Sequence, residues 1–247
     1  MNGLNVVIVH GFSSQRGEKR LKLLIEKIKK ELPGAKIIIP NYLERYSRLG
    51  VITAGKKSIT EYAAICKNII LKKKGEGPLF LIGYSLGGLI ARVLIERMGI
   101  SAQAIILVGT PNEGTKLNRW EKTLVKMLKR PIIEEVLPDS QFLTNLNERY
   151  EKLRLQTKYY LLAGTKDKRV PVWSALGGEI IRSDGTFIGS TDHSGLIPRK
   201  PKSEPNAIDI IIQILKEEAG FSSASFLFIL SERHTFSVLQ NLNFLVN

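Results

Sequence analysis

One serine in this sequence lies in a setting that is typical of a catalytic nucleophile. Ser85 is the centre of GYSLG (83–87), a G-x-S-x-G pattern between an apolar run of strand length, 79–82, and a helical pattern over 86–98. The glycines two residues before and after the serine allow a strand and a helix to approach closely around a sharp turn. Amides at the start of the helix would then point toward the carbonyl that the serine attacks. The pattern therefore predicts that Ser85 is a nucleophile.

A serine hydroxyl needs a base to take its proton, and the sequence contains three histidines. His10 follows the first apolar run and precedes the serine, and His234 lies close to the C-terminus. His193 follows the serine and precedes the last helical pattern. The order serine, acid, histidine that accompanies this kind of turn selects His193 as the base. We expect His10 to brace its own loop instead.

Three aspartates are candidates for the acid that orients His193. Asp167 follows the expected strand 159–163, and catalytic groups gather at the carboxyl ends of parallel strands. Asp184 is explained by a β-turn between two short strands, and Asp192 is the immediate neighbour of His193, from which its side chain should diverge. We therefore predict that Asp167 is the acid.

The negative charge that forms on an attacked carbonyl oxygen needs two backbone N–H donors. One comes from the residue after the nucleophile, Leu86, and the other from an early loop after a strand, which in this chain is Phe12. Gly11 lets this early loop approach the substrate. The sequence predicts Phe12 and Leu86 as the oxyanion hole.

Strands and helices alternate along the chain and must position these residues. Strands are expected at 4–9, 36–39, 79–82, 104–108 and 159–163, and helices at 16–32, 58–71, 86–98 and 207–219. Helices supply the crossovers that parallel strands need. The prediction is an α/β fold: a mostly parallel, doubly wound sheet with helices on both faces, in one domain over residues 1–220. The 247 residues, 43% of them hydrophobic, suit a single core.

Two segments depart from the alternation. Residues 111–157 form a basic, mostly helical insertion, which is read either as a lid or as an ordinary packed pair of helices. Its apolar residues at helical spacing are Leu117, Trp120, Leu124 and Leu128. Residues 221–247 form an apolar tail without lysine, and no role is assigned to it. Docking on the domain, self-association, membrane contact and a poorly ordered addition all stay open for the tail.

Composition restricts the classes of function. The formal charge of +14 favours anionic partners, but many basic residues recur on expected helical faces, and no nucleic-acid-binding motif accompanies them. The single cysteine, Cys66, excludes an intramolecular disulfide and a multi-cysteine metal site. We read neither a cleavable signal nor a run of 18 apolar residues, so the expected location is cytoplasmic.

Five segments together resemble the lipase and esterase branch of the α/β-hydrolase family. They are VHGF (9–12), GYSLGG (83–88), VGTPNEGT (108–115), GTKDKRVP (164–171) and DHSGL (192–196), and the resemblance spans about residues 4–219. In similar lipases a histidine often follows GTP, where this chain has Asn112. The resemblance implies hydrolysis of carboxylic esters through an acyl-enzyme on Ser85, without cofactor or metal.

Other functions use the same residues. The triad would also serve an acyl-thioesterase or an amidase, which differ only in the pocket. A non-catalytic hydrolase-fold protein that binds anionic membrane surfaces is the alternative from another class. The expected partners are a small-molecule or lipid ester and, as a further candidate, an anionic membrane surface, with no specific nucleic acid. The acyl-chain length and oligomeric state are left open.

Overall fold

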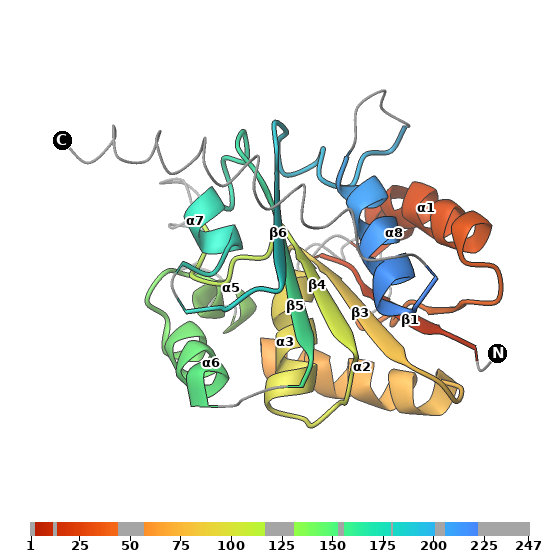
Figure 1. Cartoon of the computed structure of the whole chain (residues 1–247). Helices are drawn as coiled ribbons and strands as arrows, with labels where there is room; N and C mark the ends of the chain where they lie inside the picture. The colour runs from red at the N-terminus through yellow and green to blue at the C-terminus, as the bar shows by residue number, and fades with distance from the viewer. Residues whose placement is uncertain are drawn as a thin grey trace.

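The fold is taken from a computed structural model, which describes residues 3–11, 14–43, 57–116, 131–152, 156–178, 180–200 and 206–221. Its centre is a six-stranded sheet in the order β2-β1-β3-β4-β5-β6 (Figure 1). The strands are β1 (Asn5–Val9), β2 (Lys36–Ile38), β3 (Leu79–Tyr84), β4 (Ala104–Val108), β5 (Lys158–Gly164) and β6 (Gly185–Gly189). All five strand pairs are parallel, as the alternation of strands and helices predicted.

Helices cover both faces of this sheet. Helices α1 (Ser14–Glu31) and α8 (Ala207–Glu218) pack on one face, and α2 (Ile59–Lys73) and α3 (Leu86–Glu96) on the other (Figure 1). Alternate residues of each strand face the two layers, so Val6 and Ile8 belong to the first core and Val7 to the second. The doubly wound α/β prediction is confirmed.

Local sequence explains where two of these helices begin. Ser58 caps α2, because its hydroxyl accepts from the Glu61 amide while the Glu61 carboxylate accepts from the Ser58 amide. Asn206 and Asp209 make the same reciprocal cap at α8. Each cap satisfies backbone donors that the first helical turn leaves unpaired.

The insertion contributes two described helices, α5 (Pro131–Glu135) and α6 (Gln141–Lys152), and α6 packs against α3. Its other expected helical stretch, with Leu117, Trp120, Leu124 and Leu128, lies outside the described residues, as does the tail after residue 221. A moving lid and the 1–220 domain boundary therefore stay predictions. Among the described residues, no helix has the length and apolar character needed to cross a membrane.

Helix α7 (Val172–Ala175) was not expected from the sequence, whereas the edge strand β6 is the second of the two short strands expected around the turn at Asp184. Strand β6 begins and ends with glycine and is half-buried throughout, so it lacks the apolar run that marks the inner strands. Asp184 directly precedes β6 and accepts from the Tyr159 amide at 2.8 Å, and residues 180–183 before it form turn and loop. The expected turn between two short strands is therefore wrong at its first strand.

Candidate active site

Ser85 occupies the tight turn between β3 and α3. Its backbone has φ 55° and ψ −127°, in the left-handed region that residues with a side chain rarely adopt. The Ser85 amide donates to the carbonyl oxygen of Val108 at 2.8 Å, which ties the turn to the end of β4. The strained turn presents the Ser85 hydroxyl at the carboxyl edge of the sheet.

The glycines of the GYSLGG segment are required by close backbone contacts. A side chain on Gly83 would collide with the backbone of Gly88, and one on Gly87 would collide with the carbonyl of Val9. A side chain on Gly88 would collide with Thr110. The strand, the helix and the neighbouring loops can therefore approach one another only because these positions lack a Cβ.

The structure brings Ser85, His193 and Asp167 together from three separate loops. The His193 Nε2 atom lies 3.0 Å from the Ser85 Oγ, and the His193 Nδ1 atom lies 2.6 Å from the Asp167 Oδ2. Because a carboxylate only accepts, Nδ1 carries the proton toward Asp167 and Nε2 is left to accept from the serine hydroxyl. This arrangement allows the histidine to take a proton from Ser85.

Asp167 is held as a carboxylate. Its Oδ1 accepts from the amides of Arg169 and Val170 at 2.9 and 3.0 Å, and the residue is 8% exposed. Burial favours the neutral acid, but the hydrogen bond and charge of His193 and the two amides outweigh it, so the pKa of Asp167 lies below its usual value. Asp192 instead accepts from the Gly195 amide, away from His193.

The early loop that was expected to complete the oxyanion hole is described up to Gly11. A Cβ on Gly11 would lie 3.2 Å from the Ser85 Cβ, so this loop runs directly beside Ser85. The His10 ring stacks on Tyr42 with centroids 4.6 Å apart, and the Tyr42 hydroxyl donates to the His10 carbonyl at 2.6 Å. Leu86 is the first residue of α3, where amides lack intrahelical partners, whereas Phe12 lies outside the described residues.

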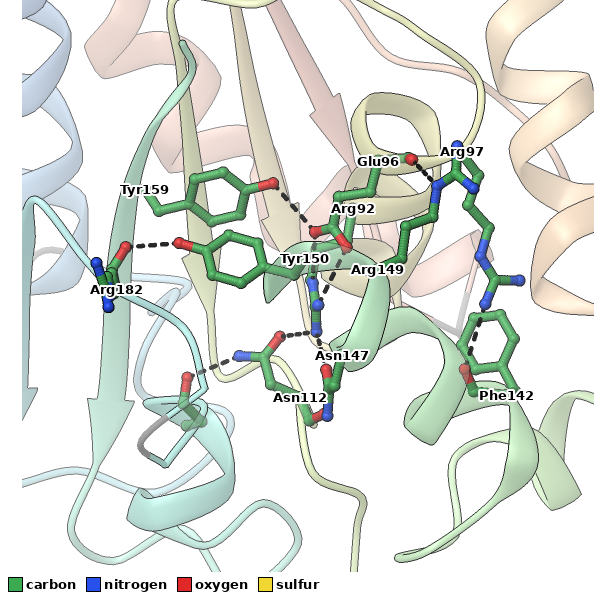
Figure 2. A network of polar contacts seen from close by, with 11 residues as sticks. Arg92, Glu96, Arg97, Asn112, Phe142, Asn147, Arg149, Tyr150, Tyr159 and Arg182 are labelled. Atoms are coloured by element: carbon green, nitrogen blue, oxygen red, sulfur yellow. Dashed lines mark hydrogen bonds and ion pairs between the residues drawn. The ribbon is translucent and has the colours of Figure 1, made fainter. Parts of the chain in front are cut away.

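Asn112, which stands where similar lipases often have histidine, is a buried bridge (Figure 2). Its side-chain amide donates to the carbonyl of Ala175 at 3.0 Å, and its oxygen accepts from Arg92 at 3.3 Å. An asparagine can make both bonds because its side chain carries a donor and an acceptor. Asn112 thereby links the loop after β4 to α7, the helix that follows the Asp167 loop in the chain.

Sequence reasoning gave no role to Tyr84, Tyr42 or Arg92, although all three contact segments of the site. Tyr84 lies inside the G-x-S-x-G pattern, and this position was the only sign in the sequence that it belongs to the site.

A cavity of about 400 Å³ lies near α6 and α7. It is lined by Glu113, Leu143 and Trp173 among others, and its lining does not include Ser85, Asp167 or His193.

Metal-ligand clusters and the single cysteine were the other candidate reactive groups in the part of the chain that the structure describes. No group of three or more potential metal ligands occurs among the residues that the structure describes. Cys66 is buried, and burial raises the pKa of its thiol to about 12, so it is a thiol rather than a thiolate at neutral pH.

A parallel sheet that carries the serine turn after its third strand, with acid and histidine loops further along the chain, defines an α/β-hydrolase. The model of the palmitoyl protein thioesterase family matches residues 5–136, more than half of this chain. The chain belongs to the palmitoyl protein thioesterase family and is a hydrolase of the α/β type. The match covers Ser85 and ends before Asp167 and His193, and a search of curated proteins gives no match.

Solved structures share the fold at low sequence identity. A Paleococcus ferrophilus monoacylglycerol lipase has a TM-score of 0.60 and 19% identity, over 90% of this chain and 97% of that chain. An α/β hydrolase from the metagenome of lagoon sediments at Mar Chica, Morocco, has a TM-score of 0.60 and 18% identity, over 89% and 93%. Mouse α/β hydrolase domain-containing protein 10 has a TM-score of 0.54 and 18% identity, over 86% and 88%.

Proposed function

We propose that this protein hydrolyses carboxylic esters through an acyl-enzyme on Ser85. The observation that carries the proposal is the hydrogen-bonded chain from Ser85 through His193 to Asp167. It starts at a serine whose backbone is held in a strained turn at the edge of the sheet. The same three residue types, with the histidine between serine and carboxylate, activate a hydroxyl in unrelated hydrolases.

Each step of the proposed reaction has a group to perform it. The Ser85 Oγ attacks the acyl carbonyl carbon while its proton passes to His193 Nε2. In this proposal the Leu86 amide at the start of α3 stabilises the oxyanion, and the negative charge of Asp167 stabilises the imidazolium. The tetrahedral intermediate breaks its bond to the leaving group, which takes the proton from Nε2. Water then attacks the acyl-enzyme with His193 as base, and the acid leaves as the serine regains its proton.

Acyl thioesters are the second candidate substrates, because the chain belongs to the palmitoyl protein thioesterase family. A thioester enters the same two steps, with a thiol in place of the alcohol as leaving group. A matched pair of substrates, an oxygen ester and a thioester of the same acyl chain, separates the two candidates. The kcat/KM ratio of the pair reports the preferred leaving group.

The test compares wild type, Ser85→Ala and Ser101→Ala. Ser101 is an exposed serine on the loop before β4, so its variant controls for the loss of a hydroxyl elsewhere. The substrates are p-nitrophenyl esters of short and long acyl chains, together with the ester and thioester pair. We expect Ser85→Ala to lose roughly 10⁴-fold or more in kcat, and Ser101→Ala to match wild type. A folded Ser85→Ala variant with wild-type turnover would overturn the proposal.

A further inference from the structure

Tyr84 is the last residue of β3 and the immediate neighbour of Ser85 in the chain. The alternation of the strand places its side chain in the core layer of α1 and α8, together with Ile82. Leu196 and Ile197, from the loop that carries His193, belong to the same core. Tyr84 is 7% exposed, so the ring lies beneath the histidine loop rather than in solvent.

Two contacts join Tyr84 to His193. The Tyr84 hydroxyl donates to the carbonyl oxygen of His193 at 2.8 Å. The two rings also pack together, with centroids 5.3 Å apart and planes inclined by 31°. One side chain therefore contacts both the backbone and the imidazole of the same residue, which limits the movement of the loop and of the ring.

The surroundings restrict the imidazole from a second direction. Gly109, at the end of β4, has φ 55°, and a Cβ there would lie 3.3 Å from the His193 Nδ1 and 2.8 Å from Leu196. The start of the His193 loop is also held in place, because the Lys166 amide donates to the carbonyl of Thr191 at 3.0 Å. Gly109 thus limits the imidazole from the end of β4, the Lys166 amide holds the chain two residues before His193, and Tyr84 supplies the contact from the end of β3.

We propose that Tyr84 is a positioning residue that fixes His193 relative to Ser85. Tyr84 and Ser85 are consecutive residues at the end of β3. The end of this one strand therefore holds both Ser85 and, through Tyr84, His193. The 3.0 Å contact between His193 Nε2 and Ser85 Oγ then depends on Tyr84 as well as on the loop that connects β6 to His193. This inference rests on the proposed function, because positioning has a kinetic meaning only if His193 is the base.

Removing the hydroxyl should affect the chemical steps more than substrate binding. His193 acts in both acylation and deacylation, so a loosened imidazole slows both. Tyr84 lies in the α1 and α8 core, so its hydroxyl is not expected to contribute to KM. For Tyr84→Phe we expect kcat to fall roughly tenfold, KM to stay within about twofold, and the rate of inactivation by a fluorophosphonate to fall in parallel.

The matched control is Tyr150→Phe. The Tyr150 hydroxyl also donates to a backbone carbonyl at 2.8 Å, that of Arg182 (Figure 2). Both variants remove the same atom and the same type of bond, but Tyr150 does not contact the triad. The experiment measures kcat and KM per titrated active site, the inactivation rate, and the melting temperature. Tyr150→Phe should keep the wild-type kcat and inactivation rate even if its melting temperature falls.

Different results would overturn the positioning role of Tyr84 and the proposed role of Ser85. A Tyr84→Phe variant with wild-type kcat and inactivation rate would overturn the positioning role, as would a rise in KM at unchanged kcat. An equal loss of kcat in Tyr150→Phe would also overturn it, because the loss would then come from general loosening of the fold. Full activity of Ser85→Ala in the same assay would instead contradict the proposed function.

Discussion

Both carboxylate oxygens of Asp167 are occupied by hydrogen-bond donors. His193 binds Oδ2, and the amides of Arg169 and Val170 bind Oδ1. These donors favour the ionised form and hold the pKa of Asp167 below its usual value despite burial. A carboxylate that ionises more readily in the folded than in the unfolded state couples folding to pH.

The sign of this coupling gives a prediction for Asp167→Asn. With the folded pKa below the unfolded value of about 3.9, the carboxylate stabilises the fold above that value and loses its contribution as the pH falls through the folded pKa. The asparagine does not titrate. We therefore expect the melting temperature to fall less between pH 7 and pH 3 in Asp167→Asn than in wild type.

Thermal unfolding of both proteins across this pH range measures the difference. Asp192→Asn is the control, because it removes an exposed carboxylate beside His193 and leaves Asp167 in place. This control should keep the wild-type acid slope. An Asp167→Asn variant whose melting temperature falls as steeply as that of wild type would show that Asp167 does not contribute in this way.

Residue types and their order were enough to nominate Ser85, His193 and Asp167. The partners of Tyr84 and Asn112 were not predictable, because each bonds to a backbone carbonyl far away in the chain, His193 or Ala175. A carbonyl is present at every position and leaves no mark on the sequence. Only the tertiary structure selects which carbonyl is reached.

Between elements, a fully buried ion pair connects four parts of the fold. Arg92 and Glu96 pair within α3 at 2.8 Å, and both side chains are completely buried. Arg92 also donates to Asn147 on α6 at 2.9 Å, and the Tyr159 hydroxyl on β5 donates to Glu96 at 3.0 Å (Figure 2). With Asn112 as a further partner, the pair joins α3, α6, β5 and the loop after β4.

Removal of one charge from this pair should be far more costly than removal of both. Arg92→Met leaves Glu96 buried without its cation, and we expect it to lower the free energy of unfolding by about 3–5 kcal/mol. Arg92→Met with Glu96→Met removes the isolated charge, so the double variant should be more stable than Arg92→Met alone. Urea denaturation of the wild type, both single variants and the double variant measures the coupling. A double variant less stable than Arg92→Met would contradict this interpretation.

The main strands and helices were predictable because their apolar patterns extend over many residues. The β3 run and the α3 pattern, for example, reappear as Leu79–Tyr84 and Leu86–Glu96. Helix α7 was missed, and β6 was expected only as a short strand after the turn at Asp184, because a single helical turn and five half-buried residues carry little periodicity. These short elements are determined by the sheet edge and the loops against which they pack.

For the whole molecule, the two core layers fix the sheet and leave its carboxyl edge for chemistry. The loops after β1, β3, β4, β5 and β6 all meet at this edge (Figure 1). They carry Gly11, Ser85, Gly109, Asp167 and His193. The parallel topology therefore explains why residues distant in sequence form one site, and it was the part of the fold that the sequence predicted best.

The family match covers only the first part of this arrangement. It includes β1, the Ser85 turn and the Asn112 loop, and it ends before the segments of Asp167 and His193. The complete triad therefore depends on the geometry of loops that the family model does not cover. If these loops are arranged as described, Ser85 is the reactive serine of the chain.

The most direct measurement is the site of covalent modification by a fluorophosphonate probe. Trypsin cleavage after Lys74 and Arg92 releases the peptide 75–92, in which Ser85 is the only serine. Intact-mass and peptide analysis should find one adduct per chain on this peptide, none in Ser85→Ala, and much slower labelling in His193→Ala. Folded wild-type protein that stays unlabelled, or that is labelled at another residue, would show that Ser85 is not the nucleophile.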